Sequence, residues 1–314
     1  MLVVVAFVAW TAWDLGKRWQ EAPAVAPHMG WLLLSCVPIA LVSLVQALGW
    51  QSLIVRMAGR PVPAILSMEL FLASMLGRYA PAKVGMAAVL ITRAKQLQLS
   101  AALMGSAMLL IVLVYAILGA GMGLATMTLT EGAVIPPQLE ALRSGLGWLA
   151  LGGMALAVVM LLVVDRRRYP AIVLRLLRLD GEGPLVGPGV VFWYGTVWVF
   201  WWIHGVLLVH AVGGTWAEGI EGAGLFVIAP VVGFLALVAP GGLGVREAVV
   251  AVGLEGSIGP GPAVVAALVS RFVSLGADLF MWLGFRAVVQ RRGLIEKAET
   301  ANVDDERSPD APTT

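Results

Sequence analysis

Residues 77–86 read GRYAPAKVGM, and they interrupt an apolar stretch that extends from 64 to 92. Arg78, Pro81 and Lys83 therefore stand near the middle of a segment that is otherwise hydrophobic enough for a lipid bilayer. A charged side chain at the centre of a membrane helix costs roughly 2.5–3.5 kcal/mol, and a proline removes a backbone hydrogen bond there. Irregular backbone at membrane depth is tolerated only against protein or a water-filled cavity. The stretch thus predicts a broken element inside a membrane domain.

The composition of the whole chain indicates an integral membrane protein. Of its 314 residues, 60% are hydrophobic and 13% are charged, whereas soluble domains have about 45–50% apolar and about 25% charged residues. We expect one transmembrane domain over 1–292 and a disordered cytoplasmic tail over 293–314, because the tail lacks the apolar residues that offset ordering entropy. No basic cluster has interleaved aromatic residues, which excludes a recognisable nucleic-acid partner.

Apolar runs of suitable length predict the spanning helices. They lie at about 29–55, 101–128, 145–164, 189–212 and 263–285. The N-terminal run MLVVVAFVAWTAW adds a shorter helix, or one truncated by a misplaced start. The sequence therefore predicts an all-α polytopic membrane helix bundle of about six spanning helices, with two further apolar stretches that are broken near their centres.

Basic residues orient this bundle, because short cytoplasmic loops accumulate Lys and Arg. We expect the protein in the plasma membrane. Its arginine-rich segment 165–180 and its basic C-terminal end are expected on the cytoplasmic side. The loop 213–221, GGTWAEGIE, has two acids and no base and is expected outside. The broken stretch 222–254 then begins and ends outside, and 64–92 begins and ends inside. Both are short for two crossings, so we predict two re-entrant helical hairpins of opposite orientation.

The two broken stretches share a sequence pattern. APGGLGVREA (239–248) and the segment that begins at position 80 both read A-P-x-x-Φ-G, where Φ is apolar, at an offset of 159 residues. We predict an inverted repeat of one unit, with repeat one at about 29–128 and repeat two at about 189–289. Such repeats with broken helices are typical of transporters, and the breaks mark the substrate site. The predicted turn residues are Pro81, Gly85, Pro240, Gly241, Gly242 and Gly244.

Seven charged residues are expected within or near the membrane. They are Glu69, Arg78, Lys83, Arg246, Glu247, Arg271 and Asp278. One interpretation makes them structural ion pairs, since Arg271 and Asp278 lie on one helix face and Arg246 adjoins Glu247. Arg78 and Lys83 have only Glu69 close in sequence, so surplus positive charge is expected at the first break, where it suits an anionic headgroup. Glu69, Arg271 and Asp278 are either coupling residues or members of structural pairs.

GRYAPAKVG, followed by Arg93, and APGGLGVREA resemble the two signature stretches of the lysylphosphatidylglycerol synthase transmembrane-region family, also called flippase-like membrane proteins. The likeness extends over about 29–290, and the second stretch is the more specific. The first stretch has Ala82 where relatives often have Gly. In larger members this unit moves aminoacylated phospholipid between leaflets while a separate soluble domain makes it. The resemblance implies the translocating half alone.

We therefore expect a translocator, and not an enzyme, for a lipid with a phosphate headgroup. The residues expected to bind substrate are Arg78, Tyr79, Lys83, Arg246 and Glu247, the last balancing charge or coupling to protons. The expected partners are membrane lipids and a separate lipid-modifying enzyme. The alternatives are a non-transporting scaffold for such an enzyme, and a membrane-embedded enzyme that uses Glu247 or Asp278 as a general base. The oligomeric state is not predicted.

No metal, cofactor or catalytic constellation is expected. Cys36 is the single cysteine, and His204 and His210 lie six residues apart, which is not the i, i+4 spacing of a helical metal pair. No Ser-His-Asp, HExxH or paired-carboxylate motif is present. His204 is expected to be either a hydrogen-bonded interior residue or part of a proton relay. Small residues at Gly119, Gly121 and Gly123 predict close helix packing.

Overall fold

The computed structural model describes residues 26–79, 84–130, 143–163, 186–236 and 239–295. Within these ranges every regular element is helical, and six helices are long and apolar enough to cross a membrane. They are α2 (Met29–Ala58), α5 (Ala101–Leu129), α6 (Arg143–Val163), α8 (Pro188–Ala211), α9 (Trp216–Leu235) and α11 (Pro260–Arg291). The predicted all-α membrane bundle is therefore confirmed. The predicted N-terminal helix lies outside the described residues.

The first broken stretch consists of short helices. α3 (Ala64–Leu76) ends in a 3-10 turn, η1 (Gly77–Tyr79), and α4 (Val84–Thr92) follows. At 1.5 Å per residue, the 13 residues of α3 extend only about 20 Å, less than the roughly 30 Å hydrocarbon core. The predicted break is present, whereas the re-entrant path of the stretch stays a prediction. Pro81 and Lys83 lie outside the described residues.

The second broken stretch differs from the prediction at its start. α9 begins at Trp216, so residues 216–221, expected in a loop, form its first turns. A capping box explains this start: the Thr215 hydroxyl accepts from the Glu218 N–H at 3.2 Å, and the Glu218 carboxylate accepts from the Thr215 N–H at 2.6 Å. With 20 residues, α9 is long enough to cross a membrane, so the expected short half-helix is wrong here. Beyond it lie the 3-10 turn η6 (Pro240–Gly242) and α10 (Val245–Ile258).

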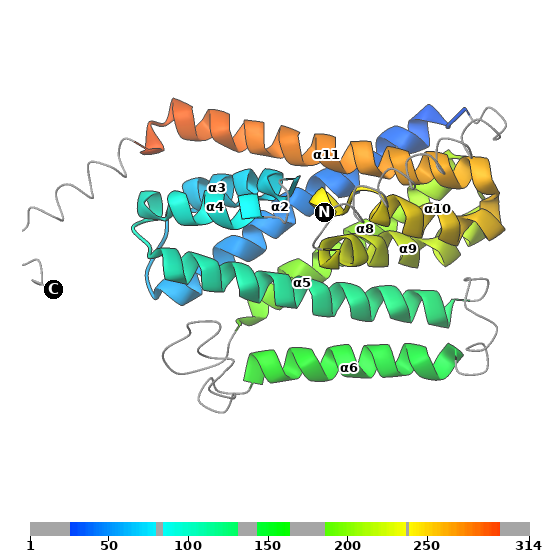
Figure 1. Cartoon of the computed structure of the whole chain (residues 1–314), viewed down its shortest axis with the longest axis horizontal. Coiled ribbons are helices and arrows are strands. Elements are labelled where there is room, and N and C mark those ends of the chain that lie inside the picture. Colours follow the sequence, from blue (N-terminus) through cyan, green and yellow to red (C-terminus); the bar gives the residue numbers. More distant parts are fainter. Residues whose placement is uncertain (1–25, 80–83, 131–142, 164–185, 237–238, 296–314) are drawn as a thin grey trace, which may run out of the picture.

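The two broken stretches occupy opposite ends of the bundle. Figure 1 shows α3 and α4 beside one end of α11, and α9 and α10 beside its other end. The packing between the two predicted repeats is reciprocal: α2 packs on α8, α3 packs on α11 as α9 packs on α5, and η1 packs on η6. This reciprocity is the pattern that a two-fold relation between the repeats requires. In the described part of the chain, α6 packs extensively on one helix, α5.

Small residues on α5 allow the close packing that was predicted. A Cβ atom added to Gly121 would lie 2.6 Å from the Cβ of Met154 in α6, and one added to Gly123 would lie 3.0 Å from the Cβ of Ile228 in α9. Both separations are shorter than normal carbon contacts. Glycine at these positions therefore lets α5 approach helices on two sides.

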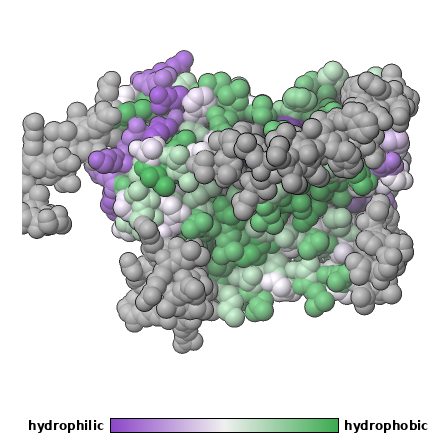
Figure 2. All heavy atoms as spheres, in the orientation of Figure 1, coloured by the Kyte–Doolittle hydropathy of each residue, from purple (hydrophilic) through white to green (hydrophobic). Residues whose placement is uncertain are grey.

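The surface matches a lipid-facing bundle. Figure 2 shows hydrophobic residues over the middle of the face in view and hydrophilic residues at the end where α3, α4 and the C-terminal end of α11 lie. Large apolar side chains are widely exposed, among them Trp148 of α6 and Phe272 and Phe280 of α11. An apolar belt of this extent is what the hydrocarbon core covers.

Candidate functional site

The two breaks meet where η1 packs on η6, and each break is closed by a glycine contact within its own stretch. A Cβ atom on Gly77 would lie 2.5 Å from the carbonyl carbon of Gly85, and one on Gly242 would lie 2.7 Å from the carbonyl oxygen of Gly233. In each broken stretch, the chain before the break therefore touches the chain at or after it, backbone against backbone. Gly242 also has a φ of 71°, which L side chains rarely adopt. Gly85 and Gly242 were predicted as turn residues, whereas Gly77 and Gly233 were not.

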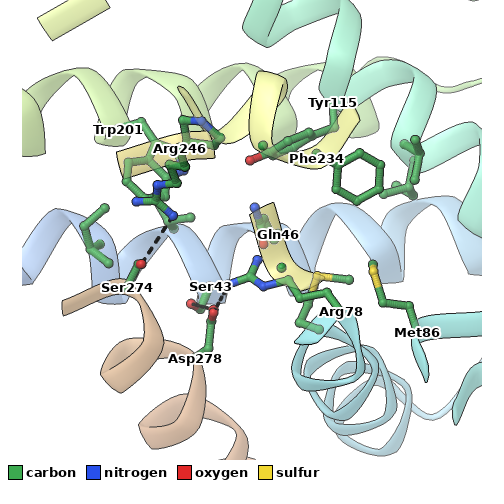
Figure 3. A pocket seen from close by; sticks show the side chains of 18 of the residues that line it. Ser43, Gln46, Arg78, Met86, Tyr115, Trp201, Phe234, Arg246, Ser274 and Asp278 are labelled. Atoms are coloured by element: carbon green, nitrogen blue, oxygen red, sulfur yellow. Dashed lines mark hydrogen bonds and ion pairs between the residues drawn. The ribbon is translucent and has the colours of Figure 1, made fainter. Parts of the chain in front are cut away.

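A cavity lies at this meeting point, and both repeats line it. Its volume, taken as the space open to the centre of a water molecule, is about 70 Å³. Its polar lining includes Ser43, Gln46, Arg78, Tyr115, Arg246, Arg271, Ser274 and Asp278. Figure 3 shows Arg78 and Arg246 directed into the cavity from different elements, with Gln46 between them in this view. The apolar lining includes Phe71, Met75, Met86, Met108, Ile111 and Phe234.

Arg78 forms an ion pair across the two repeats. Its guanidinium donates from η1 to the carboxylate of Asp278 in α11, and the Ser43 hydroxyl donates to the other oxygen of that carboxylate at 2.9 Å. The expectation that Arg78 lacks a neutralising acid is therefore wrong. Its partner lies 200 residues later in the chain. A search for acids close in sequence therefore could not find it.

Glu247 and Arg271 form a second pair, which holds the other break. Arg271 Nε lies 3.4 Å from Glu247 Oε1, and Arg271 Nη1 donates to the Gly241 carbonyl at 2.9 Å. The Gly244 N–H donates to Glu247 Oε2 at 2.8 Å. These bonds satisfy backbone groups that the irregular turn would otherwise leave unpaired at membrane depth. The pairs expected from sequence, Arg271 with Asp278 and Arg246 with Glu247, are not the pairs that form.

Arg246 differs from the other two arginines of the cavity because its partners are neutral. Its guanidinium lies over the ring of Trp201, 4.4 Å from the centroid, and donates to Ser270 Oγ at 3.2 Å and to Ser274 Oγ at 3.4 Å. Only 7% of the residue is exposed. Among the described residues, no carboxylate lies within ion-pair distance of it.

The described charges at the cavity therefore sum to a positive value. Three arginines, Arg78, Arg246 and Arg271, stand against two carboxylates, Glu247 and Asp278, so three minus two leaves one positive charge. Water and opposite charge are the usual compensation for a buried guanidinium. Here the guanidinium of Arg246 faces a cavity, where an anionic ligand can supply the compensating negative charge.

Glu69 lies outside this cavity. Its carboxylate is fully buried and accepts from Arg93 Nη2 at 2.7 Å and from Trp282 Nε1 at 3.3 Å, while Arg286 Nη1 lies 3.6 Å away. The cluster thus ties α3 to the segment after α4 and to α11. Of the two interpretations left open for Glu69, the geometry favours a structural pair.

The remaining predicted residues are placed as follows. Tyr79 is the last residue of η1 and Pro240 the first of η6, and Lys83 lies outside the described residues. His204 is fully buried and hydrogen-bonded on both ring nitrogens, which confirms a hydrogen-bonded interior residue. Within the described ranges, no three His, Cys, Asp or Glu side chains are grouped as metal ligands would be.

The cavity also contains polar residues that the sequence analysis missed. They are Ser43, Gln46, Tyr115 and Ser274, with Ser270 directly behind Arg246. The available signal was a lone polar side chain within a spanning run, as at Ser43 and Gln46 in IALVSLVQALGW. Polar residues inside membrane helices usually face the protein interior.

Fold and site together define a class: a polytopic membrane protein whose broken helices meet at a charged interior cavity. The family model described as the lysylphosphatidylglycerol synthase TM region matches residues 1–280. The chain belongs to this family, as its two signature stretches indicated. A search of curated proteins found no match.

Proposed function

We propose that this protein translocates a lipid with a phosphate headgroup between membrane leaflets, and that the headgroup occupies the cavity between the two breaks. The observation that carries the proposal is Arg246. Its buried guanidinium has only neutral partners in the described part of the chain. The family, named for the membrane region of a lipid synthase, supports a lipid as the substrate class.

The charges of the described cavity residues favour an anionic ligand. An uncompensated buried guanidinium is costly, and a phosphate oxygen both neutralises it and accepts its N–H groups in bidentate geometry. The described residues leave a single positive charge, which a phosphodiester balances.

The lining of the cavity favours an amphiphile over a soluble anion. Arg246, Trp201 and Ser274 lie toward one side of the cavity, whereas Met86 and Phe234 lie toward the other (Figure 3). A lipid with its headgroup at Arg246 would have an apolar surface for its first chain carbons. Methionine side chains suit variable chains because they are flexible and polarisable.

Translocation requires that the cavity open to each leaflet in turn. The reciprocal packing of the repeats and their broken helices supports this step, because rocking of one repeat against the other is how such architectures alternate access. We further propose a plasma-membrane location with a cytoplasmic C-terminus, since Arg286, Arg291 and Arg292 gather at the end of α11. The lipid leaves chemically unchanged, and a separate lipid-modifying enzyme is the proposed partner that makes it.

The test is a leaflet-exposure assay in proteoliposomes with fluorescent phosphatidylglycerol, quenched from outside by a membrane-impermeant reductant. The wild-type chain should make the inner-leaflet label accessible, and Arg246→Ala should abolish this. Arg292→Ala, at the exposed end of α11, is the matched control and should retain activity. If the wild type moves neither phosphatidylglycerol nor phosphatidylcholine, the proposal fails and a scaffold role is favoured. A change in the mass of recovered lipid would indicate an enzyme instead.

A further inference from the structure

Arg246 is the end of a buried hydrogen-bond chain that continues away from the cavity. Arg246 Nη2 donates to Ser270 Oγ at 3.2 Å, Ser270 Oγ lies 3.0 Å from His204 Nε2, and His204 Nδ1 lies 2.9 Å from the Ser35 carbonyl oxygen. Ser270 is 1% exposed and His204 is fully buried. The chain therefore crosses from α10 through α11 and α8 to α2 without reaching water.

The donor and the acceptor of each hydrogen bond in this series follow from the groups at its two ends, the Ser35 carbonyl and the Arg246 guanidinium. A carbonyl oxygen only accepts, so His204 Nδ1 carries a hydrogen and donates to Ser35. A second cation directly behind Arg246 would add an uncompensated buried charge, so the imidazole is neutral and its Nε2 accepts. Ser270 then donates its hydroxyl hydrogen to His204. The lone pairs of Ser270 Oγ are thereby left to accept from Arg246.

This directionality determines what Ser270 presents to the guanidinium. Without an acceptor at His204 Nε2, the hydroxyl is free to rotate and place its hydrogen toward Arg246, where it repels the N–H group. His204 itself is held by edge contacts with Trp201 and Phe226, at centroid distances of 5.7 and 5.8 Å. Trp201 also supplies the ring beneath the guanidinium, so one helix, α8, provides both the ring and the histidine.

We infer that His204 and Ser270 are positioning residues for Arg246, and that they fix its guanidinium toward the cavity through neutral bonds that leave its charge for an anionic ligand. The inference rests on the proposed function and extends it to residues that do not line the cavity. A carboxylate in their place would hold the guanidinium equally well and cancel its charge. The neutral hydrogen bonds of Ser270 and His204 therefore orient the guanidinium without neutralising its charge.

The test measures binding, independently of transport, by native mass spectrometry of the detergent-purified chain titrated with phosphatidylglycerol and, in parallel, diacylglycerol, which lacks the phosphate. Ser270→Ala removes the acceptor, and we expect the affinity for phosphatidylglycerol to fall about tenfold or more, the usual effect of one charge-assisted hydrogen bond. His204→Phe keeps the ring and its edge contacts while deleting both nitrogens, and should lower the same affinity. Ser270→Thr retains the hydroxyl and should restore most of the binding.

Two comparisons distinguish positioning from a general loss of packing. The double variant Ser270→Ala/His204→Phe should bind phosphatidylglycerol no more weakly than Ser270→Ala, because His204 acts only through Ser270. Ser106→Ala removes a buried hydroxyl that bonds only within its own helix, α5, and should change nothing. Binding of diacylglycerol, which has the same acyl chains but no phosphate for Arg246, should be unaffected in every variant.

The outcomes also separate this inference from the proposed function. If the wild type shows no preference for phosphatidylglycerol over diacylglycerol, the proposed function fails and the inference fails with it. If the wild type shows the preference but Ser270→Ala and His204→Phe keep it, or if their effects simply add, the inference alone is overturned. An equal loss of both lipids in folded variants also overturns it, since that result indicates packing.

Discussion

Replacing Glu69 by glutamine is expected to destabilise the fold without changing the cavity. The substitution keeps the volume of the side chain and one acceptor oxygen, but it removes the charge that Arg93 and Arg286 share. Breaking a buried ion pair costs about 3–5 kcal/mol. The side chains of Arg93 and Arg286 are 22% and 32% exposed, so water partly screens the charges left behind. We therefore expect a loss of about 2–3 kcal/mol.

The measurement is thermal unfolding of the detergent-purified chain, where this loss corresponds to a fall in Tm on the order of 5 °C. A double-mutant cycle with Arg93→Gln isolates the pair: its effect should be small once Glu69 is already glutamine. The control is Glu221→Gln in α9, a partly exposed position without an ion pair in the described chain, which should stay within about 0.5 kcal/mol of wild type. A neutral or stabilising Glu69→Gln would refute the reasoning, because it would mean that desolvation of the carboxylate outweighs its pairing.

Three further outcomes are expected. Arg246→Lys keeps the charge but loses the planar, forked donor, so phosphatidylglycerol affinity in native mass spectrometry should fall about tenfold, less than for Arg246→Ala. Asp278→Asn removes one negative charge from the cavity and should tighten the binding of the same lipid, and weaker binding would contradict the charge count. Gly242→Ala, with φ at 71° and a contact of 2.7 Å to the Gly233 oxygen, should cost about 1–3 kcal/mol in thermal unfolding, whereas Gly276→Ala, with open space around it, should be neutral or slightly stabilising.

Much of the fold follows from local features of the sequence. α5 and α6 could each be predicted from an apolar run, because the length and hydropathy of a run are local properties of the sequence. The helix starts at Pro188 and Pro260 each follow a glycine, and proline is favoured at the first position of a helix. The start of α9 was missed because GGTWAEGIE was treated as a loop on its acidic charge, although its Thr215 and Glu218 have the spacing of a capping box.

The candidate site was only partly predictable. The breaks were found because Pro, Gly and charge are visible against an apolar background. The pairing of the charges was not, since it depends on which helices meet: Asp278 bonds Arg78 rather than Arg271 on its own helix. The serines around Arg246 carry no charge and no motif. Their role becomes visible only when α10 is packed against α11.

The order of synthesis gives the cross-repeat pair a further meaning. Arg78 is made 200 residues before Asp278, and at about 5–20 residues per second the ribosome needs on the order of ten to forty seconds to cover that interval. During this time α3 and the arginine of the turn η1 that follows it enter the membrane without the partner that Arg78 has in the finished protein. The N-terminal half must therefore wait, with water, lipid headgroups or an insertion factor around Arg78, until α11 arrives and closes the bundle.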